Sequence, residues 1–468
     1  MSESGRIIED KILSLPDFSS SERYSEPLEC YELDSLFSRL PKNDSVFYLE
    51  SGSSGRKILL LGEKWSIDIY SFKVEIRIKG VVETFDREGM SQAQILNSVE
   101  VWLQNQPDCL LGTSLMYEAG WDGEKRKARI NRLLPDVTIV CPREVVIQDR
   151  ENVAISYRDK AIESALRENN HTFKTYFSKD CVIRNKISKE TYLESITKIK
   201  DKIRSGHSFQ VNYSQAFEAD GEIDLLSWAK SLFKKEPGHY SCLVMRDEYT
   251  ILSISPERLV AKKGEQLITR PIAGTFAKTI NTDDIEDALK GFKNHPKELA
   301  EHNMLIDLER NDLGKISKVG SVNIHEYLSI EELPHLYHLV SEVRSETQKG
   351  KGIGDVIQAM FPGGTITGCP KLETMFILNQ LEQSDRKFYT GSVGYIGKDS
   401  ADLNILIRTA LIEGNRITMR FGGGIVWDSE PEKEYLESLT KARGLILSLI
   451  NGGAHCDFDN RSLRQFFT

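Results

Sequence analysis

Apolar and polar positions along this chain follow two patterns. Short apolar runs are typical of strands, and longer stretches with apolar residues about every 3.6 positions are typical of helices. In the first part of the chain, the runs predict strands at 46–49, 57–62, 67–72, 110–117 and 136–141. One helix is predicted there, over 91–104. We therefore expect a β-rich region over residues 1–150 that begins with a polar lead-in.

The segment from about 150 to 188 is polar and is expected to connect this region to a second one over 188–450. There, apolar residues spaced by three or four from Tyr192 to Ile203 predict a helix that stops at Gly206. Further helices are predicted at 297–312, 355–360, 370–382 and 432–450. Strands are predicted at 208–217, 240–244, 250–254, 259–262, 321–327, 339–343, 389–396, 404–412 and 416–421. Because the two kinds of element are mixed without strict alternation, we expect an α+β fold, followed by a short polar tail over 451–468.

The helix predicted over 297–312 carries two acids on an apolar side. At about 100° per residue, Glu298, Glu301, Leu305 and Leu308 fall along one stripe. A carboxylate that points toward an apolar interior is unfavourable unless it is paired, and a divalent metal is one such partner. The alternative is that both acids are solvated and complement the helix dipole.

A second acid pair of the same spacing lies near the end of the chain. Glu434, Glu437, Lys441 and Gly444 recur at helical steps. Two helices that each present such a pair would form an oxygen-rich site for Mg²⁺ shared with an anionic substrate. The alternative for this pair is an ordinary surface contact between Glu437 and Lys441, worth about 0.2–0.5 kcal/mol.

Two glycine-rich segments and one arginine are candidates for anion binding. Backbone N–H groups approach an anion closely in the run Gly422, Gly423 and Gly424, although a bulge or tight connection explains that run equally well. The segment 363–368 precedes a predicted helix, whose N-terminus favours an anionic group. Side chains alternate along the predicted strand 404–412, so Arg408 is expected on the same face as Leu406. A buried arginine needs a carboxylate partner there, which is either a ligand carboxylate or an internal acid.

Composition narrows the class of protein. With 40% hydrophobic and 28% charged residues and a net charge of −9, the chain is typical of soluble globular proteins, and nucleic acid is not the expected partner. No apolar run is long enough to span a membrane, and no signal peptide is expected. The seven cysteines are scattered and form no CxxC pair, which favours a reduced, cytoplasmic setting without structural zinc.

At the level of motifs, the stretch 188–450 resembles the chorismate-utilising enzymes. The resemblance is carried by several segments in the family's order. They are Ser255-Pro256-Glu257, Arg270-Pro271-Ile272-Ala273-Gly274-Thr275, Glu298–Asp312, His338-Leu339-Val340-Ser341, Gly364–Lys371 and Gly422-Gly423-Gly424. The first region resembles, more weakly, the N-terminal part of anthranilate and aminodeoxychorismate synthase large subunits. The resemblance implies two packed antiparallel β-sheets surrounded by helices, as in anthranilate synthase component I, with a site between the sheets.

The resemblance also implies roles for individual residues. Glu298, Glu301, Glu434 and Glu437 would hold Mg²⁺, directly or through water. The carboxylates of chorismate would be held by Arg408, Tyr389, Lys441 and the amides of Gly422, Gly423 and Gly424. Thr275, Thr365 and His338 would line the ring. Glu257 would be the acid beside the departing C4 hydroxyl, since a carboxylic acid that stays protonated in a closed site can donate a proton.

Gln210 indicates which nucleophile is used. Members that use water carry a lysine base at the position of Gln210, and glutamine is not a base, so the resemblance implies ammonia. The chain contains no amidotransferase domain, so a separate glutamine amidotransferase subunit in a heterodimer is implied. The motif Gln210-Val211-Asn212 resembles aminodeoxychorismate synthases, which make a precursor of p-aminobenzoate and folate.

Two further features bear on this choice. Many aminodeoxychorismate synthases have a lysine at the position of Ala273. Anthranilate synthases have alanine there, as this chain does, and they therefore remain the alternative. His239 and Ser241 replace residues that bind feedback tryptophan in anthranilate synthases, while Glu50-Ser51 keep an acid–serine pair of that pocket.

Overall fold

The computed structural model describes most of the chain. It covers residues 2–17, 23–27, 44–51, 55–87, 89–107, 109–122, 134–148, 152–156, 181–236, 238–277, 290–291, 296–332, 336–458 and 466–467. At 23–27, 152–156, 273, 275–277, 297–298 and 336 it describes the backbone alone. The stretch 125–132, which contains five lysines and arginines, and most of the predicted connection over 150–188 lie outside the described residues.

The fold is built on two large β-sheets, whose described strands are antiparallel except for the pair β11 and β25. In spatial order, the first sheet contains β1 (Arg23–Pro27), β10 (Asn152–Ser156), β9 (Glu144–Gln148), β3 (Arg56–Leu61), β2 (Val46–Ser51), β13 (Tyr240–Met245), β14 (Thr250–Ser255), β23 (Thr409–Glu413), β24 (Arg416–Ile425), β12 (Gln210–Asp220), β11 (Val182–Asn185) and β25 (His455–Cys456). The short strand β20 (Gly368–Cys369) also pairs with β12.

The second sheet contains, in spatial order, β17 (Ile272–Ala277), β19 (Leu336–Glu346), β16 (Gln266–Thr269), β15 (Arg258–Lys263), β22 (Ser400–Asn404), β21 (Ser392–Gly397), β7 (Leu110–Leu115), β8 (Val137–Cys141), β4 (Trp65–Ile69), β5 (Lys73–Ile78) and β6 (Val81–Asp86), with β18 (Asn323–Glu332) beside β19. Strands from before and after residue 150 pair within both sheets, for example β2 with β13 and β7 with β21. The two regions outlined by the sequence therefore share both sheets.

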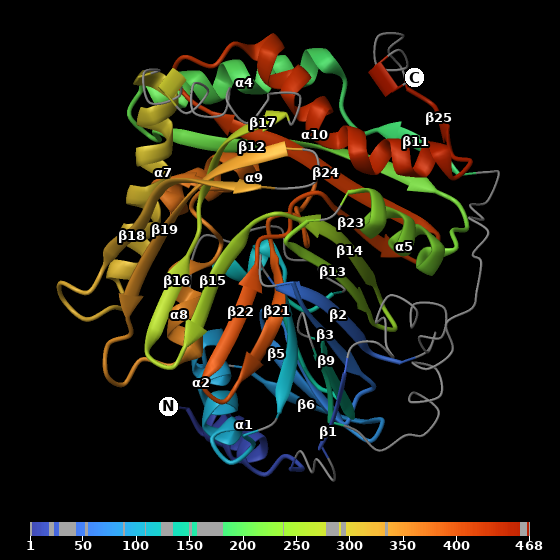
Figure 1. Cartoon of the computed structure of the whole chain (residues 1–468), viewed down its shortest axis with the longest axis vertical. Coiled ribbons are helices and arrows are strands. Elements are labelled where there is room, and N and C mark those ends of the chain that lie inside the picture. The colour runs from blue at the N-terminus through green and yellow to red at the C-terminus, as the bar shows by residue number, and fades with distance from the viewer. Residues whose placement is uncertain are drawn as a thin grey trace.

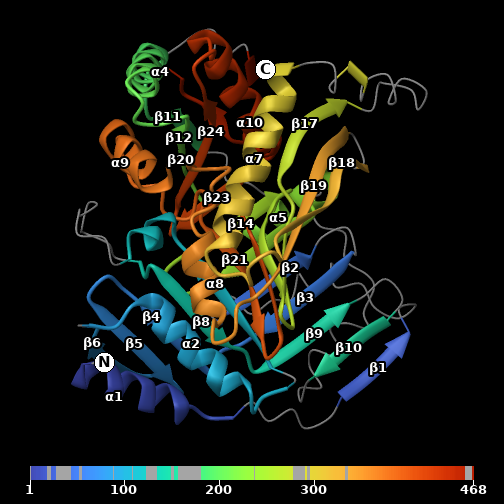
Figure 2. The same cartoon turned by 90° about the vertical axis from the view of Figure 1, so that its left-hand side faces the viewer.

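Helices cover the outer faces of the sheets. They are α1 (Glu3–Leu13), α2 (Gln92–Leu103), α4 (Lys189–Arg204), α5 (Leu225–Lys235), α7 (Pro296–Gly314), α8 (Ile353–Met360), α9 (Lys371–Leu381) and α10 (Pro431–Asn451), with a 3₁₀ turn at Tyr117–Trp121. Figure 1 shows α4, α5 and α10 beside β12 and β24, and α1 and α2 at the other end of the molecule. Figure 2 shows α7 running along β17 and β19 above α8.

Strand side chains alternate between two cores, which explains the continuous apolar runs. Val46 and Tyr48 of β2 belong to the core beneath α4, α5 and α10, whereas Phe47 and Leu49 belong to the core between the sheets. A strand buried on both faces has no polar face to show and therefore reads as an unbroken apolar run. The predicted α+β fold of two packed sheets with surrounding helices is confirmed.

One predicted strand is wrong. The stretch 404–412 is not a single strand, because β22 ends at Asn404 in the second sheet and β23 begins at Thr409 in the first. Residues 405–408 carry the chain from one sheet to the other, and Arg408 ends that crossing with a left-handed backbone (φ +50°). Arg408 therefore does not share a strand face with Leu406. The apolar run 405–407 looked like a strand because Ile405 and Leu406 are buried between the layers.

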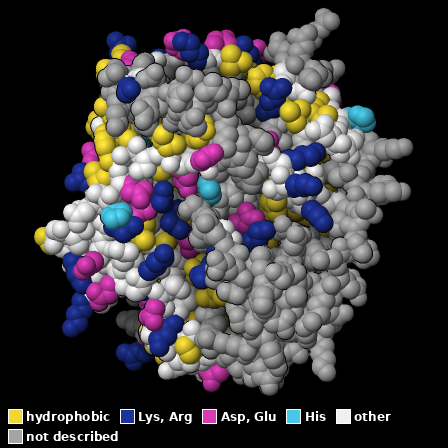
Figure 3. Space-filling view, in the orientation of Figure 1, with side chains coloured by type: hydrophobic (Ala, Val, Ile, Leu, Met, Phe, Trp, Pro, Cys, Tyr) yellow, Lys and Arg dark blue, Asp and Glu magenta, His cyan; other side chains and the backbone are white. Residues whose placement is uncertain are grey.

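The C-terminal tail packs more closely than its polar composition indicates. His455 and Cys456 form β25 beside β11, and Phe458 and Phe467 are buried in the same core as Phe217. None of the described helices is both long and apolar enough to cross a lipid bilayer. In the space-filling view, acidic, basic and histidine side chains lie together near the middle of one face (Figure 3).

Candidate active site

A cavity of about 510 Å³ brings most of the predicted site residues together. Its walls come from β12, β24, α7, α10, the loop 363–368 and the crossing 405–408. The predicted residues that line it are Gln210, Glu257, Glu301, Thr365, Tyr389, Arg408, Gly422, Gly424, Glu434, Glu437 and Lys441. These residues are far apart in the sequence, so the fold, and no local motif, creates the site.

Three carboxylates from two helices face this cavity, Glu301 from α7 and Glu434 and Glu437 from α10. Burial raises the pKa of Glu434, and the negative charges of Glu437 and Glu301 raise it further. Lys441 is the nearby cation, with its Nζ 2.8 Å from Glu437 Oε1 and 3.1 Å from the carbonyl oxygen of Gly422. The repulsion among the carboxylates fits a site that a divalent cation would stabilise.

The described side chains do not by themselves complete a metal site. No group of three or more His, Cys, Asp or Glu in the described part of the chain has a geometry that would hold a metal ion. The side chain of Glu298, the fourth predicted acid, lies outside the described residues. Mg²⁺ commonly keeps several water ligands, so an arrangement in which waters separate it from some of these carboxylates remains compatible with the geometry.

Gly422, Gly423 and Gly424 lie inside β24, so neither a connection nor a bulge explains them. They pair regularly with Ser214, Tyr213 and Asn212 of β12. A Cβ atom at Gly423 would lie 3.4 Å from Glu437 and 3.6 Å from Glu434, and one at Gly424 would lie only 2.1 Å from Gln210 Nε2. The absence of a side chain at Gly424 therefore gives the Gln210 amide the space it occupies across the strand.

Arg408 lines the cavity without an internal partner. It makes no hydrogen bond or ion pair with any side chain in the described ranges, which leaves a ligand carboxylate as the better of the two alternatives. Burial lowers the pKa of its guanidinium, and the charge of Glu236 opposes that shift. The left-handed backbone at Arg408 is a strained conformation of the kind that functional sites hold in place.

Glu257 is a buried carboxyl group beside Thr365. It follows β14, and its carboxyl oxygen accepts a hydrogen bond of 3.0 Å from Thr365 Oγ1. Burial raises its pKa to about 7, although the hydrogen bond from Thr365 and the charge of Lys441 oppose the shift. A buried carboxyl group with this pKa can donate a proton near neutral pH.

The remaining predicted residues either lie near Glu257 or have side chains outside the described part of the chain. Burial raises the pKa of Tyr389 to about 12, so its hydroxyl stays protonated. His338, on β19, is buried but does not line the cavity as described, and burial, followed by the charge of Arg408, lowers its pKa to about 4. The side chains of Ala273 and Thr275, on β17, lie outside the described residues, although the backbone of Thr275 pairs with His338.

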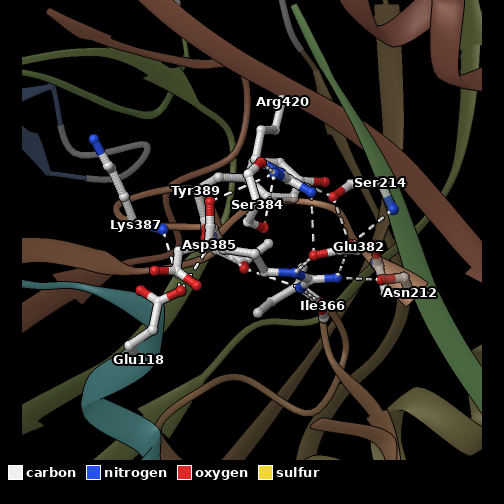
Figure 4. Close-up of polar contacts among 12 residues, drawn as sticks. Glu118, Asn212, Ser214, Ile366, Glu382, Ser384, Asp385, Lys387, Tyr389 and Arg420 are labelled. Atoms are coloured by element: carbon white, nitrogen blue, oxygen red, sulfur yellow. Dashed lines mark hydrogen bonds and ion pairs between the residues drawn. The ribbon is translucent and has the colours of Figure 1, made fainter. Parts of the chain in front are cut away.

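Sequence reasoning missed three polar residues that line the cavity, Asn212, Arg420 and Ser429. Asn212 and Arg420 lie two positions from a predicted site residue on the same strand, so the period-two rule would have found them. Arg420 belongs to a buried charged cluster in which Glu382 binds Arg386 at 2.8 Å and Arg420 at 3.1 Å, and Ser214 donates to Glu382 at 2.7 Å (Figure 4). This cluster fixes β12 and β24 behind the cavity.

Comparison with known proteins places this geometry in a family. The family described as chorismate binding enzyme matches residues 44–447. The chain is 42% identical over 256 residues to aminodeoxychorismate synthase component 1 of Bacillus subtilis, which covers 54% of each chain. It is 40% identical over 272 residues to an anthranilate synthase component 1 of Haloarcula marismortui, covering 58% of this chain and 54% of that one.

Each of these alignments spans about half the length of the relative. A solved structure, anthranilate synthase component I from Streptococcus pneumoniae, superimposes with a TM-score of 0.68 at 24% identity and covers 83% of this chain and 91% of that one. That likeness concerns the fold.

Proposed function

The chain belongs to the chorismate binding enzyme family, and we propose that it is the synthase subunit of an aminodeoxychorismate synthase. In this reaction, ammonia replaces the C4 hydroxyl of chorismate and water leaves. The observation that carries the proposal is Gln210. An amide, which is no base, lines the cavity that also holds the protonated acid Glu257, so the nucleophile must arrive already neutral and nucleophilic, as ammonia does.

Glu257 performs the proton chemistry in this proposal. Its carboxyl proton passes to the departing hydroxyl oxygen, which leaves as water, while the nitrogen of ammonia bonds to the ring. One proton of the new ammonium group then returns to the Glu257 carboxylate. Thr365 orients the carboxyl group through its 3.0 Å hydrogen bond.

The carboxylates of chorismate are held by cations in this proposal. Arg408 has no side-chain partner among the described residues, and in this proposal it binds one carboxylate with two parallel hydrogen bonds. Glu301, Glu434 and Glu437, together with Glu298, would hold Mg²⁺, directly or through water. When bound, Mg²⁺ would neutralise the second carboxylate of the substrate. Lys441 supplies further positive charge beside Gly422.

Ammonia would come from a separate glutamine amidotransferase subunit. The family resemblance implies this partner. The B. subtilis relative is named component 1, which fits an enzyme of more than one component.

A second candidate is anthranilate synthase component I, which also uses ammonia and then eliminates pyruvate. Two observations favour it. Anthranilate synthase relatives match at nearly the same identity as the aminodeoxychorismate synthase, 40% against 42%. The alanine at position 273 is also the residue that anthranilate synthases have at this position, according to the family resemblance.

Product analysis separates the two candidates. The purified chain is incubated with chorismate, Mg²⁺ and ammonium chloride at alkaline pH, and a lyase specific for aminodeoxychorismate is then added. We expect p-aminobenzoate to appear only after the lyase. Anthranilate formed without the lyase would replace the proposal by the second candidate, and chorismate left unconsumed would remove both.

The metal assignment predicts a specific effect of Glu434→Gln. Because Mg²⁺ affinity depends on the number of carboxylates in the site, the Mg²⁺ concentration for half-maximal activity should rise about tenfold or more. Calorimetric titration of Mg²⁺ should show the same loss. Glu432→Gln is the matched control, because Glu432 lies on the same helix, is exposed and pairs with Lys189 away from the cavity. Equal Mg²⁺ affinity in both variants would contradict the assignment.

The Glu50–Ser51 pocket predicts insensitivity to tryptophan. Its cavity measures about 10 Å³, room for roughly one water molecule. Its own side chains fill it, since Ser51 donates to Asp402 at 2.6 Å and Arg258 binds the same carboxylate at 2.8 Å. Tryptophan should therefore change neither the rate nor the thermal unfolding midpoint. Inhibition that saturates with tryptophan would contradict this expectation and favour the second candidate.

A further inference from the structure

The loop between α8 and α9, residues 361–370, carries Thr365 to Glu257. Thr365 Oγ1 donates a hydrogen bond of 3.0 Å to the Glu257 carboxyl group, and both side chains are buried. On the far side of the loop, the carbonyl oxygen of Ile366 accepts a hydrogen bond of 3.2 Å from Arg386 (Figure 4). The position of Thr365 therefore depends on how this loop is anchored.

Lys371 ties the two ends of the loop together. It is the first residue of α9, and its Nζ donates to the carbonyl oxygens of Met360 at 3.1 Å and Ala359 at 3.3 Å, which end α8. The same Nζ lies 2.8 Å from Asp312 Oδ2 on α7. An ammonium group has three N–H bonds, one for each of these oxygens. A single side chain thus joins three helices around the loop.

The charges around Lys371 make Asp312 its counter-charge. Burial lowers the pKa of Lys371, and the charge of Asp312 opposes that shift. Glu309, one turn earlier on α7, is also buried, and burial followed by the charge of Asp312 raises its pKa to about 8. Glu309 is therefore mostly uncharged near neutral pH. Lys315 Nζ lies 2.7 Å from the other oxygen of the Asp312 carboxylate, but its side chain is half exposed.

Stability alone is a weak reason for a lysine at this position. The side chains of Lys371 and Asp312 are 17% and 5% exposed, and a buried ion pair is often no more stable than apolar side chains of similar volume. What the pair provides is a fixed geometry. A Cβ atom at Gly364 would lie 3.4 Å from Leu308 and 3.6 Å from Asp312, so the loop backbone packs directly on α7 beside the ion pair.

We propose that Lys371 is a positioning residue for the acid: by binding Asp312 and the end of α8, it holds the loop where Thr365 reaches Glu257. The inference rests on the proposed role of Glu257 as the proton donor. Thr365 and Glu257 line the cavity and Lys371 does not, so Lys371 acts through Thr365 and not by contact with the substrate.

The test is the pH profile of kcat, measured as chorismate consumption with Mg²⁺ and free ammonia saturating at each pH. The hydrogen bond from Thr365 lowers the pKa of Glu257, so its loss should move the fall of kcat to higher pH by about one unit. Thr365→Val and Lys371→Met should both show this shift. Lys371→Met should also lower kcat about tenfold to a hundredfold, as expected when a contact of the acid is misplaced.

Lys315→Met is the matched control. It removes the other amine from the same Asp312 carboxylate by the same substitution, and it should leave both kcat and the pH profile unchanged. In the Thr365→Val background, Lys371→Met should cause no further shift, because the hydrogen bond that it positions is already lost.

Hydrogen exchange reads the position of the loop without the reaction. The amides of Thr367 and Gly368 bond the carbonyl oxygen of Gly364 at 3.3 Å and 2.9 Å. They should exchange faster in Lys371→Met than in the unaltered chain, and at the original rate in Lys315→Met. If Lys371→Met proves poorly folded, Asp312→Asn removes the same ion pair and serves in its place.

The outcomes separate this proposal from the proposed function. A shift in Thr365→Val without one in Lys371→Met, or equal amide exchange in the two lysine variants, would overturn the role of Lys371 and leave the proposed function standing. A further shift in the Thr365→Val background would also overturn it, because Lys371 would then act on Glu257 by its charge. No shift in Thr365→Val would refute Glu257 as the acid and overturn both.

Discussion

Glu257→Gln should lower kcat by about 10²–10⁴-fold, because general acid catalysis contributes that much and glutamine cannot donate a proton to the leaving oxygen. The amide keeps the size of the carboxyl group and its contact with Thr365, which lies 3.0 Å away. Chorismate binding through Arg408 should be little affected, so the KM for chorismate should change far less than kcat. Steady-state assays with saturating ammonia measure both constants.

The pH profile separates acid catalysis from a structural role. Burial raises the pKa of Glu257 to about 7, so the protonated, active form is lost as pH rises through that value. With free ammonia held saturating at each pH, kcat of the unaltered chain should fall above about 7, and residual activity of the variant should not follow that transition. Identical profiles would show that Glu257 is not the acid.

At alkaline pH, Glu257→Gln should raise the stability of the fold although it lowers kcat. The carboxyl group has a pKa of 4.5 when exposed and about 7 when folded, so the stability linked to its proton is complete below 4.5 and lost as pH rises through 7. Above that pH, the buried charge destabilises the fold by roughly 3 kcal/mol. Glu257→Gln removes this penalty, so urea unfolding at alkaline pH should show a variant more stable than its parent.

Local periodicity predicted that the acids lining the cavity lie on one side of each helix. Glu301 and Glu434 were found because helical spacing places them on a stripe, and each stripe does face the cavity. The same rule predicted α7 and α10 nearly to their ends, since Pro296 and Pro431 begin both helices. Such patterns depend on residues of a single helix, so they can be recognised from the sequence alone.

Other parts of the site depend on contacts that no local pattern encodes. Arg408 was assigned to a strand because the apolar residues before it are buried, but they are buried where the chain crosses between sheets. The ion pair between Glu382, at the C-terminus of α9, and Arg420 of β24 joins residues on different elements. The packing of α9 against β12, which pairs with β24, brings them together. The spacing of apolar residues along the sequence does not predict such contacts between distant elements.

Glu382→Gln should destabilise the fold by about 3–5 kcal/mol, because it leaves two buried guanidinium groups without their shared carboxylate. Glu382 bonds Arg386, Arg420 and Ser214, and all four side chains are buried. Burial alone would raise the pKa of Glu382, but the two arginines outweigh it and hold that pKa below 4.5. Urea unfolding near neutral pH measures the loss. Glu265→Gln, which removes an exposed partner of Lys318, should leave the unfolding midpoint unchanged.

The pH dependence of this loss distinguishes the missing charge from a change of packing. Because the pKa of Glu382 is lowered in the folded chain, its stabilising effect is complete above 4.5 and disappears as pH falls through the folded value. The difference between parent and variant should therefore shrink in acid, whereas a packing defect would persist at every pH. A constant difference would mean that the loss comes from packing and not from the missing charge.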